Sequence, residues 1–148
     1  MHHVTKLLYF CYGHRLLNYQ GKCRHLHGHN GKVEIELSST DLDQLGMVRD
    51  FGEIKQAIQG WIDVNLDHKM ILCQADPALA LLRQLQEPVY IIDVNPTAEN
   101  LAKLIYAEAV ALKFPVTYVR LWETETSFAT YRPVNNLRST KHQIPSSK

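Results

Sequence analysis

The sequence predicts an α+β domain in which a four-stranded antiparallel sheet carries helices on one face. Three observations lead to this fold class. Two stretches near the amino terminus read as strands, the first rich in aromatic and apolar residues and the second alternating apolar and polar ones. Two later segments repeat apolar residues with the helical period, and two more strand-like runs follow them. The predicted order is therefore β-β-α-α-β-β, in a single domain over residues 1–132.

The first two strands are expected to form an antiparallel hairpin with a long connection. Residues 4–14 are rich in aromatic and apolar types, and their parity places Tyr12 and His14 on one face. A polar loop leads to the second strand, residues 27–37, which alternates strictly. Because hairpin strands run in opposite directions, the end of the first strand should lie beside the start of the second.

The first helix is predicted to begin near Asp50, which forms a capping pair with Glu53. The apolar residues that follow share one stripe suited to packing on a sheet: Ile54, Ile58, Trp61 and Ile62. Residues 77–86 contain a weaker helical pattern. Residues 89–92 form a short β-like run that we leave outside the predicted sheet.

The second long helix is expected to open at Thr97, its N-cap residue. Strands are then predicted over residues 116–124 and 127–131. The first of these continues its apolar face into Glu123, a carboxylate that requires a partner. Residues 133–148 are polar and aperiodic, so we expect a flexible tail there.

The composition argues against several classes of function. There are 16 Lys and Arg against 15 Asp and Glu, a balance that favours neither a nucleic acid nor a membrane surface as partner. No apolar run approaches the ~20 residues that span a bilayer, and the first residues lack the apolar region of a secretory signal. The 3 cysteines include no CxxC pair, which favours a reducing, cytoplasmic location.

The candidate functional residues gather in the segment Cys23-Arg24-His25-Leu26-His27-Gly28-His29. His27 and His29 project from one face of a strand, and the hairpin brings His14 to them, so three neutral imidazoles can reach one metal ion. Three histidines without a fourth protein ligand are typical of a catalytic zinc site with an open position. Two other interpretations stay open. Cys23 could close a structural Cys-His3 site, and 8 histidines make some close pairs expected by chance.

Two further groups could take part in chemistry. Cys23 could stand beside the metal as a reactive thiol that accepts a proton. Asp67 and His68, at the end of the first helix, could form an acid–base relay. Adjacent residues rarely point the same way, however, and on these residues alone a surface Asp beside a helix-end His is the simpler interpretation.

A series of motifs resembles the 6-pyruvoyl-tetrahydropterin synthase / 6-carboxy-tetrahydropterin synthase family and covers about residues 4 to 132. In chain order the motifs are His14, Cys23-x-x-x-His27-Gly28-His29, Gly46-Met47-Val48-x-Asp50-Phe51, Leu66-Asp67-His68-Lys69, Asn95-Pro96-Thr97-x-Glu99-Asn100 and Trp122-Glu123-Thr124. Each motif alone is weak, whereas Cys-x-x-x-His-Gly-His followed by Leu-Asp-His is a specific combination.

The resemblance implies the tunnelling fold, in which subunits assemble into a barrel. The usual assembly is a homohexamer made of two trimers, with active sites at the subunit interfaces. The resemblance also implies that His14, His27 and His29 bind Zn²⁺.

The remaining roles also follow from the resemblance alone. Cys23 would be the proton acceptor, with Asp67 and His68 as a relay that a neighbouring subunit could supply. Glu123 would hold the amino-pyrimidine edge of a pterin and could join the relay, and Thr97 would contact the same ring.

The implied substrate is the small molecule 7,8-dihydroneopterin triphosphate. In the carboxy branch, the reaction releases acetaldehyde and triphosphate and leaves 6-carboxy-5,6,7,8-tetrahydropterin, a precursor of 7-deazaguanine nucleosides such as queuosine. In the pyruvoyl branch, on the tetrahydrobiopterin pathway, triphosphate leaves and the side chain is kept. The short chain and the Gly-Met-Val-x-Asp-Phe stretch favour the carboxy branch.

The chain departs from the family pattern at Cys11-Tyr12-Gly13, where the family more often has small residues such as Ala or Ser. Tyr12 shares a face with His14, so we expect the mouth of the pocket to differ. A family variant that makes a folate precursor has glutamate in place of the cysteine, and Cys23 argues against that activity.

Two functions from other classes are kept as alternatives. One is a non-catalytic zinc-stabilised oligomer that binds a pterin or purine and does not need the Cys23 thiol. The other is a zinc hydrolase, which would need a carboxylate base near the metal.

Overall fold

A long hairpin forms the centre of the sheet. Strand β1 (His2–His14) pairs antiparallel with strand β2 (His27–Ser39), with His14 opposite His27 and Tyr12 opposite His29. The predicted hairpin and its faces are therefore confirmed. In this computed structural model residues 1–134 are described, so nearly all of the predicted tail at 133–148 lies outside the described residues.

The sheet has six strands, not the four predicted, and it is mixed instead of antiparallel. Its order is β4-β3-β1-β2-β5-β6, where β5 is Val116–Thr124 and β6 is Ser127–Tyr131, both as predicted. The two additional strands, β3 (Lys69–Cys73) and β4 (Val89–Ile92), are parallel to β1 and to each other. Both are four or five residues long, and β3 ends in a buried apolar run without the alternation that marks a half-exposed strand.

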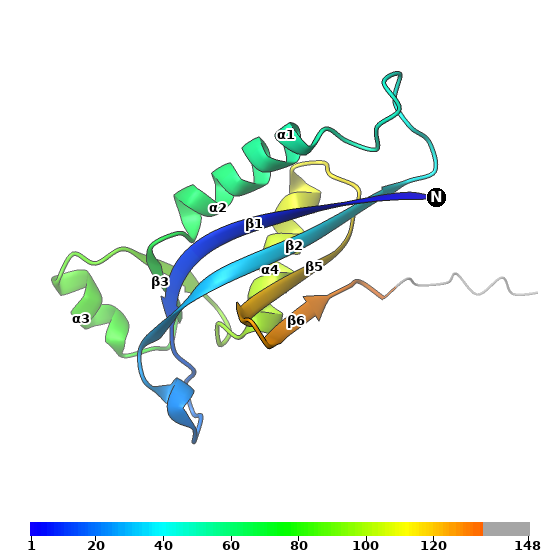
Figure 1. Ribbon diagram of the computed structural model, residues 1–148. Coiled ribbons are helices and arrows are strands. Elements are labelled where there is room, and N and C mark those ends of the chain that lie inside the picture. Colours follow the sequence, from blue (N-terminus) through cyan, green and yellow to red (C-terminus); the bar gives the residue numbers. More distant parts are fainter. Residues whose placement is uncertain (135–148) are drawn as a thin grey trace, which may run out of the picture.

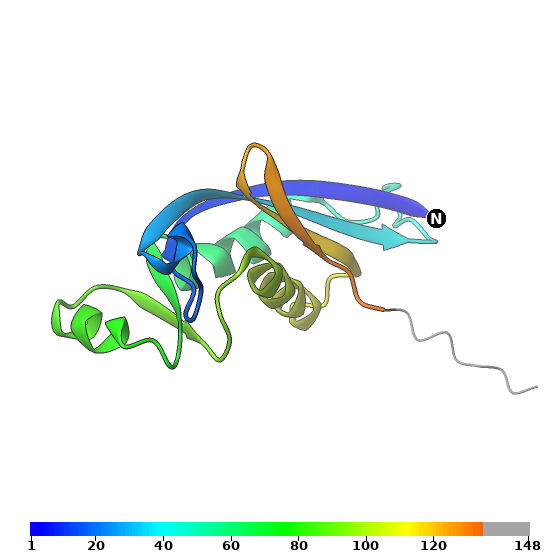
Figure 2. The same cartoon turned by 90° about the horizontal axis from the view of Figure 1, so that it is seen from below.

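Helices cover one face of this sheet, as the sequence predicts (Figures 1 and 2). The first helical segment runs through α1 (Phe51–Ile54), a π-helical turn (Lys55–Gln59) and α2 (Gly60–Asn65). Asp50 caps it by accepting a hydrogen bond from the Gly52 N–H. Helix α4 (Ala98–Ala111) packs beside the other half of the sheet.

Helix α3 (Ala78–Gln84) confirms the weaker helical pattern and lies next to β4, at the edge of the sheet (Figure 1). No helix of residues 1–134 is long and apolar enough to cross a membrane.

The core lies between the sheet and the two long helical segments. The helices contribute the predicted stripes, including Ile54, Ile58 and Ile62 from the first segment and Leu101 and Ile105 from α4, all at most 1% exposed. The inward residues of the three central strands meet them: Leu8, Phe10, Tyr12, Val33, Ile35, Leu37, Val119 and Leu121. His14 continues this inward face beyond the apolar residues, so its imidazole lies at one end of the core.

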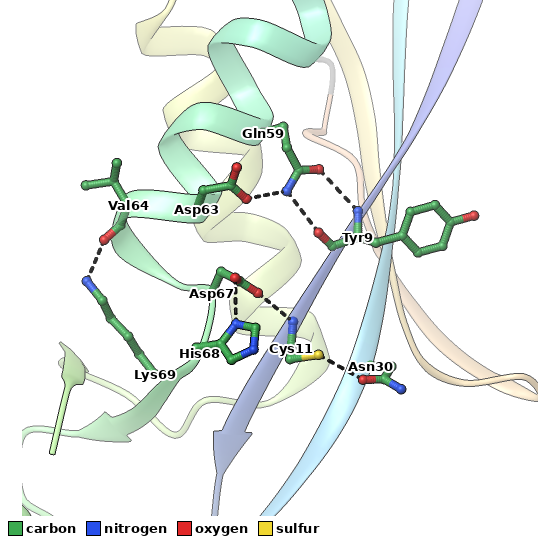
Figure 3. A network of polar contacts seen from close by, with 9 residues as sticks. All are labelled: Tyr9, Cys11, Asn30, Gln59, Asp63, Val64, Asp67, His68 and Lys69. Atoms are coloured by element: carbon green, nitrogen blue, oxygen red, sulfur yellow. Dashed lines mark hydrogen bonds and ion pairs between the residues drawn. The ribbon is translucent and has the colours of Figure 1, made fainter.

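Side chains hydrogen-bond to the backbone of β1 along the part of its edge where β3 does not pair with it. Strand β3 reaches β1 only at residues 12–14. Further back, Gln59 accepts a hydrogen bond from the Tyr9 N–H at 3.3 Å and donates one to the Tyr9 carbonyl at 2.9 Å. Asp67 accepts a hydrogen bond from the Cys11 N–H at 2.8 Å (Figure 3). The turn after α2 is therefore fixed to the strand that carries His14.

Candidate functional site

The strand register brings three imidazoles together at the end of the hairpin. His14 faces His27 with ring centroids 4.5 Å apart, and His29 lies 5.1 Å from each of them. Gly28 lies between the two histidines of β2, where a Cβ atom would come within 3.0 Å of the Tyr12 carbonyl oxygen. The close approach of the two strands thus favours glycine at this position.

Hydrogen bonds fix the direction of two of these rings. The Nδ1–H of His14 donates to the Pro96 carbonyl at 2.7 Å, and that of His27 donates to the His25 carbonyl at 2.7 Å. Since a carbonyl only accepts hydrogen bonds, each ring carries its proton on Nδ1 and leaves the lone pair of Nε2 free. Both Nε2 atoms are buried without a hydrogen-bond partner in the described residues.

The chemistry of this donor set fits a metal ion. One ligand atom from each of His14, His27 and His29 lies within 4.8 Å of the others. Burial lowers the pKa of His14, against the opposing effects of the Pro96 carbonyl and Glu123, so the ring is neutral at neutral pH, as a metal ligand must be. His25 is not part of this group: it contributes its backbone carbonyl to His27 while its own side chain is exposed.

Glu123 lies beside the imidazoles, on the inward face of β5. Its Oε1 atom is 3.7 Å from Nε2 of His14 and accepts a hydrogen bond from the Tyr12 hydroxyl at 3.4 Å. Burial, together with the negative charge of Glu123, raises the pKa of Tyr12 well above its usual value, so the phenol stays protonated and remains a donor. The carboxylate that continues the apolar face therefore has its partners in β1.

A cavity of about 330 Å³ joins three of the predicted site residues to His14. Cys23, Thr97 and Glu123 line it together with His14. Cys23 is half-buried in a short 3₁₀ turn, Lys22–Arg24, and is not part of the three-imidazole group. This arrangement leaves the thiol near the imidazoles without closing a Cys-His3 set.

Thr97 lines the cavity and is also the N-cap residue of α4. Its hydroxyl accepts a hydrogen bond from the Asn100 N–H at 3.3 Å, as the sequence predicts for the start of this helix. A hydroxyl oxygen that accepts one hydrogen bond can still donate its own proton, so Thr97 remains able to bond to a ligand in the cavity.

The Asp67–His68 pair points together, contrary to the simpler interpretation of two unrelated side chains (Figure 3). Oδ2 of Asp67 is 2.7 Å from Nδ1 of His68, while Oδ1 accepts the Cys11 N–H. The pair can form because His68 has a left-handed backbone (φ 55°), and its N–H donates to the Cys11 carbonyl at 2.7 Å. A residue held in this region of backbone space is often part of a functional site.

The charge state of this pair follows from its contacts. Burial raises the pKa of Asp67, but the hydrogen bonds from Cys11 and His68 outweigh it, so the pKa lies below its ordinary value. The carboxylate is thus ionised at neutral pH, and the His68 side chain, 78% exposed, can exchange protons with solvent or a ligand.

The structure does not bring the Asp67–His68 pair to Cys23 within one chain. His68 lines a second cavity of about 610 Å³, whose lining also includes His27 and His29. The cavity that contains Cys23 shares no lining residue with it. The thiol and the predicted relay therefore face different cavities of the same subunit.

Sequence reasoning missed the contacts that hold His14 in place. The Asn95 side chain accepts a hydrogen bond from the Leu17 N–H at 2.9 Å and donates one to the Leu17 carbonyl at 3.0 Å. Asn95 thereby fixes the segment that carries the Pro96 carbonyl to the chain just beyond His14. The only signal in the sequence was the Asn-Pro-Thr motif, which by itself indicates a helix start.

An ion pair between Arg15 and Asp76 also anchors the chain just beyond His14. Nε of Arg15 donates to Oδ2 of Asp76 at 2.7 Å, and the guanidinium also contacts Oδ1, so the pair is bidentate. The Asp76 side chain has no exposed surface, and the Arg15 hydrogen bonds hold the pKa of Asp76 below its ordinary value. The residue after His14 is thus anchored to the loop that precedes α3.

Comparisons with known proteins agree with this fold. The family described as 6-pyruvoyl tetrahydropterin synthase matches residues 3–134. A relative from Rickettsia bellii, named 6-carboxy-5,6,7,8-tetrahydropterin synthase, is 40% identical over 131 residues, which cover 84% of this chain and 95% of the relative.

Solved structures share the fold. An uncharacterized protein from Wolinella succinogenes superposes with a TM-score of 0.75 at 28% identity, covering 88% of this chain and 97% of that one. The Caenorhabditis elegans 6-pyruvoyl tetrahydropterin synthase has a TM-score of 0.66 at 21% identity, covering 88% and 94%. With the family match over residues 3–134, these likenesses show that the chain belongs to the 6-pyruvoyl tetrahydropterin synthase family of enzymes.

Proposed function

We propose that the chain is a zinc-dependent lyase that converts 7,8-dihydroneopterin triphosphate to 6-carboxy-5,6,7,8-tetrahydropterin, releasing acetaldehyde and triphosphate. The observation that carries this proposal is the group of three imidazoles beside the Glu123 carboxylate, two of them with buried Nε2 atoms that have no hydrogen-bond partner within residues 1–134. The name of the Rickettsia bellii relative supports the carboxy branch over the pyruvoyl branch. The product would serve 7-deazaguanine biosynthesis, the pathway of queuosine.

The metal would be held by His14, His27 and His29, with the Pro96 and His25 carbonyls fixing two of the rings. A bound Zn²⁺ would supply Lewis acidity to the hydroxyl groups of the substrate side chain. Three nitrogen ligands from the protein leave a position for those hydroxyls, as in catalytic zinc sites.

The pterin ring would be held at the other end of the cavity. The amino-pyrimidine edge presents paired N–H donors, and a carboxylate such as Glu123 can accept both of them. Thr97 would donate a further hydrogen bond to the same ring from its position at the start of α4. These contacts would orient the substrate side chain toward the imidazoles.

Cys23 would accept a proton from the substrate side chain, and His68 would return it with Asp67 orienting its ring. Because the thiol and the pair face different cavities, we assign the Asp67–His68 pair of each site to a neighbouring subunit. This requires an oligomer, and the assembly we propose is a homohexamer of two trimers.

Product analysis tests the reaction. The zinc-loaded protein is incubated with 7,8-dihydroneopterin triphosphate, acetaldehyde is trapped, and the pterin is identified by mass spectrometry. We expect acetaldehyde and 6-carboxy-5,6,7,8-tetrahydropterin in equal amounts. Formation of 6-pyruvoyl-tetrahydropterin would move the chain to the other branch. Pterin binding without consumption would support a binding oligomer.

Mixing two inactive variants tests the shared site. Cys23→Ala and His68→Ala oligomers are dissociated, mixed and reassembled, and light scattering checks the hexameric mass. If each site combines residues of two subunits, mixed oligomers contain some sites with both groups intact and regain part of the activity. Mixtures as inactive as the separate variants would contradict the assignment to neighbouring subunits.

A further inference from the structure

Tyr12 occupies the space between the imidazoles and Glu123. Its ring stacks on Phe10 at 4.9 Å between centroids, meets the His14 ring edge-on at 5.2 Å and lies 5.8 Å from His29. The residue is only 3% exposed, so its neighbours leave little of the ring accessible to solvent. One side chain therefore touches two of the proposed metal ligands.

Strand β2 leaves room for this ring. Gly31 has no side chain, and a Cβ atom there would lie 3.0 Å from Cε1 of Tyr12 and 3.1 Å from Cε1 of Phe10. These distances are shorter than ordinary van der Waals contacts, so a larger residue at position 31 would displace the Tyr12 ring. The large residue on β1 and the glycine on β2 thus fit each other.

The hydroxyl group of Tyr12 reaches the other end of the site. It donates to Oε1 of Glu123 at 3.4 Å, and within residues 1–134 no other side chain hydrogen-bonds to this carboxylate. The Glu123 side chain is 26% exposed and lines the cavity, so its second oxygen stays accessible. Without the hydroxyl, the carboxylate could rotate away from its present direction.

We propose that Tyr12 is a positioning residue for pterin recognition, which sets the direction of the Glu123 carboxylate and its separation from the metal centre. The proposal rests on the proposed function, since it assumes that Glu123 receives the amino-pyrimidine edge. Because the Tyr12 ring contacts His14 and the hydroxyl contacts Glu123, the residue fixes both ends of the substrate relative to each other. It acts through Glu123 and does not itself touch the reacting atoms.

The test compares Tyr12→Phe with the unchanged protein, both loaded with zinc. The variant keeps the ring and its packing and loses only the hydroxyl. We expect the dissociation constant of neopterin, a pterin without the triphosphate, to rise about tenfold, as for the loss of a hydrogen bond to a charged group. The KM of the substrate should rise by a similar factor with kcat changed less than threefold, and zinc affinity, measured by competition with a chromogenic chelator, should not change.

Tyr106→Phe is the matched control. The Tyr106 hydroxyl also donates at 3.4 Å, to the Val116 carbonyl, but from helix α4 and outside the site. This variant should bind neopterin as the unchanged protein does. The double variant Tyr12→Phe/Glu123→Ala adds a second criterion: the effect of removing the hydroxyl should fall below twofold once its acceptor is gone.

Each result bears on one conclusion. Equal neopterin affinity and equal KM for Tyr12→Phe and the unchanged protein would overturn the role of Tyr12 while leaving the proposed function intact. An undiminished effect of the hydroxyl in the Glu123→Ala background would overturn the route through the carboxylate. If the unchanged protein binds no neopterin and consumes no substrate, the proposed function fails and the role of Tyr12 fails with it.

Discussion

Nδ1 of His14 lies 2.7 Å from the carbonyl oxygen of Pro96, a residue 82 positions away in the chain. The contact joins the end of β1 to the turn that starts α4, and it fixes which ring nitrogen of His14 is free for a metal. The geometry of the candidate metal centre thus depends on a turn that belongs to neither strand of the hairpin.

Asn95→Ala should weaken zinc binding without unfolding the protein. The substitution removes both hydrogen bonds to Leu17, so the turn that presents the Pro96 carbonyl loses its attachment to the chain beyond His14. Loss of such outer contacts typically lowers metal affinity about 10- to 100-fold. Competition with a chromogenic chelator measures the affinity, and circular dichroism checks the fold. Asn65→Ala removes a comparable amide at the end of α2 and should leave zinc affinity unchanged.

Cys23→Ala should abolish turnover and leave zinc content and oligomer mass as they are. The thiol lines the cavity with His14 but stands outside the three-imidazole group, so removing it takes away a proton acceptor and no metal ligand. Zinc is counted by atomic absorption and turnover by acetaldehyde release. Cys73→Ala, which removes a buried thiol of β3, is the control and should stay active. Full activity of Cys23→Ala would exclude the assigned role, and loss of its zinc would favour a structural Cys-His3 site.

Arg15→Met should lower the free energy of unfolding by about 3 kcal/mol at pH 7, because it leaves the buried Asp76 carboxylate without its partner. Asp76→Asn should cost less, since the side chain keeps its shape and Arg15 is partly exposed. Urea unfolding followed by fluorescence gives both values. Equal stability of the Arg15→Met variant and the unchanged protein would show that the ion pair contributes nothing.

The same pair predicts how stability depends on pH. The pKa of Asp76 is lower in the folded protein than its unfolded value of about 3.9, so the contribution of the pair is complete above that pH. It is lost as the pH falls through the folded pKa, because the unfolded chain takes up a proton first. As the pH is lowered from 5 through the folded pKa of Asp76, the free energy of unfolding should therefore fall less for Arg15→Met than for the unchanged protein. Urea unfolding at several pH values measures both.

Substitutions at His68 can separate its ring from its backbone. His68 has a positive φ of 55°, which Asn tolerates and a β-branched residue does not. Both His68→Asn and His68→Val should lose turnover because neither carries an imidazole. Only His68→Val should also lose stability, by about 1 kcal/mol relative to His68→Asn. Thermal unfolding compares the two variants, and turnover in either one would remove His68 from the proposed relay.

The sequence was sufficient to predict the hairpin and the face on which its histidines lie. β1 is rich in aromatic and apolar residues, β2 alternates strictly, and antiparallel pairing leaves little freedom in where His14 meets His27. The helix stripes and the cap at Thr97 are equally local signals, and both are present in the structure.

What could not be predicted depends on contacts between distant segments. Strands β3 and β4 are short runs whose pattern does not separate a buried strand from a helix. The partners Arg15 and Asp76 are 61 residues apart, and neither has a neighbour in sequence that points to the other. Tyr12 stood out as a departure from the family pattern, but its hydrogen bond to Glu123 depends on how β5 aligns with β2, which no local motif specifies.

The side chains of Gln59 and Asp67 have a consequence for the behaviour of the protein in concentrated solution. A strand with free N–H and carbonyl groups can recruit a strand from another molecule, and such pairing leads to aggregation. By bonding to the backbone of Tyr9 and Cys11, these two side chains occupy that position on β1. Asp67 therefore protects the strand from aberrant association as well as orienting His68, and loss of activity on its substitution must be separated from loss of soluble protein.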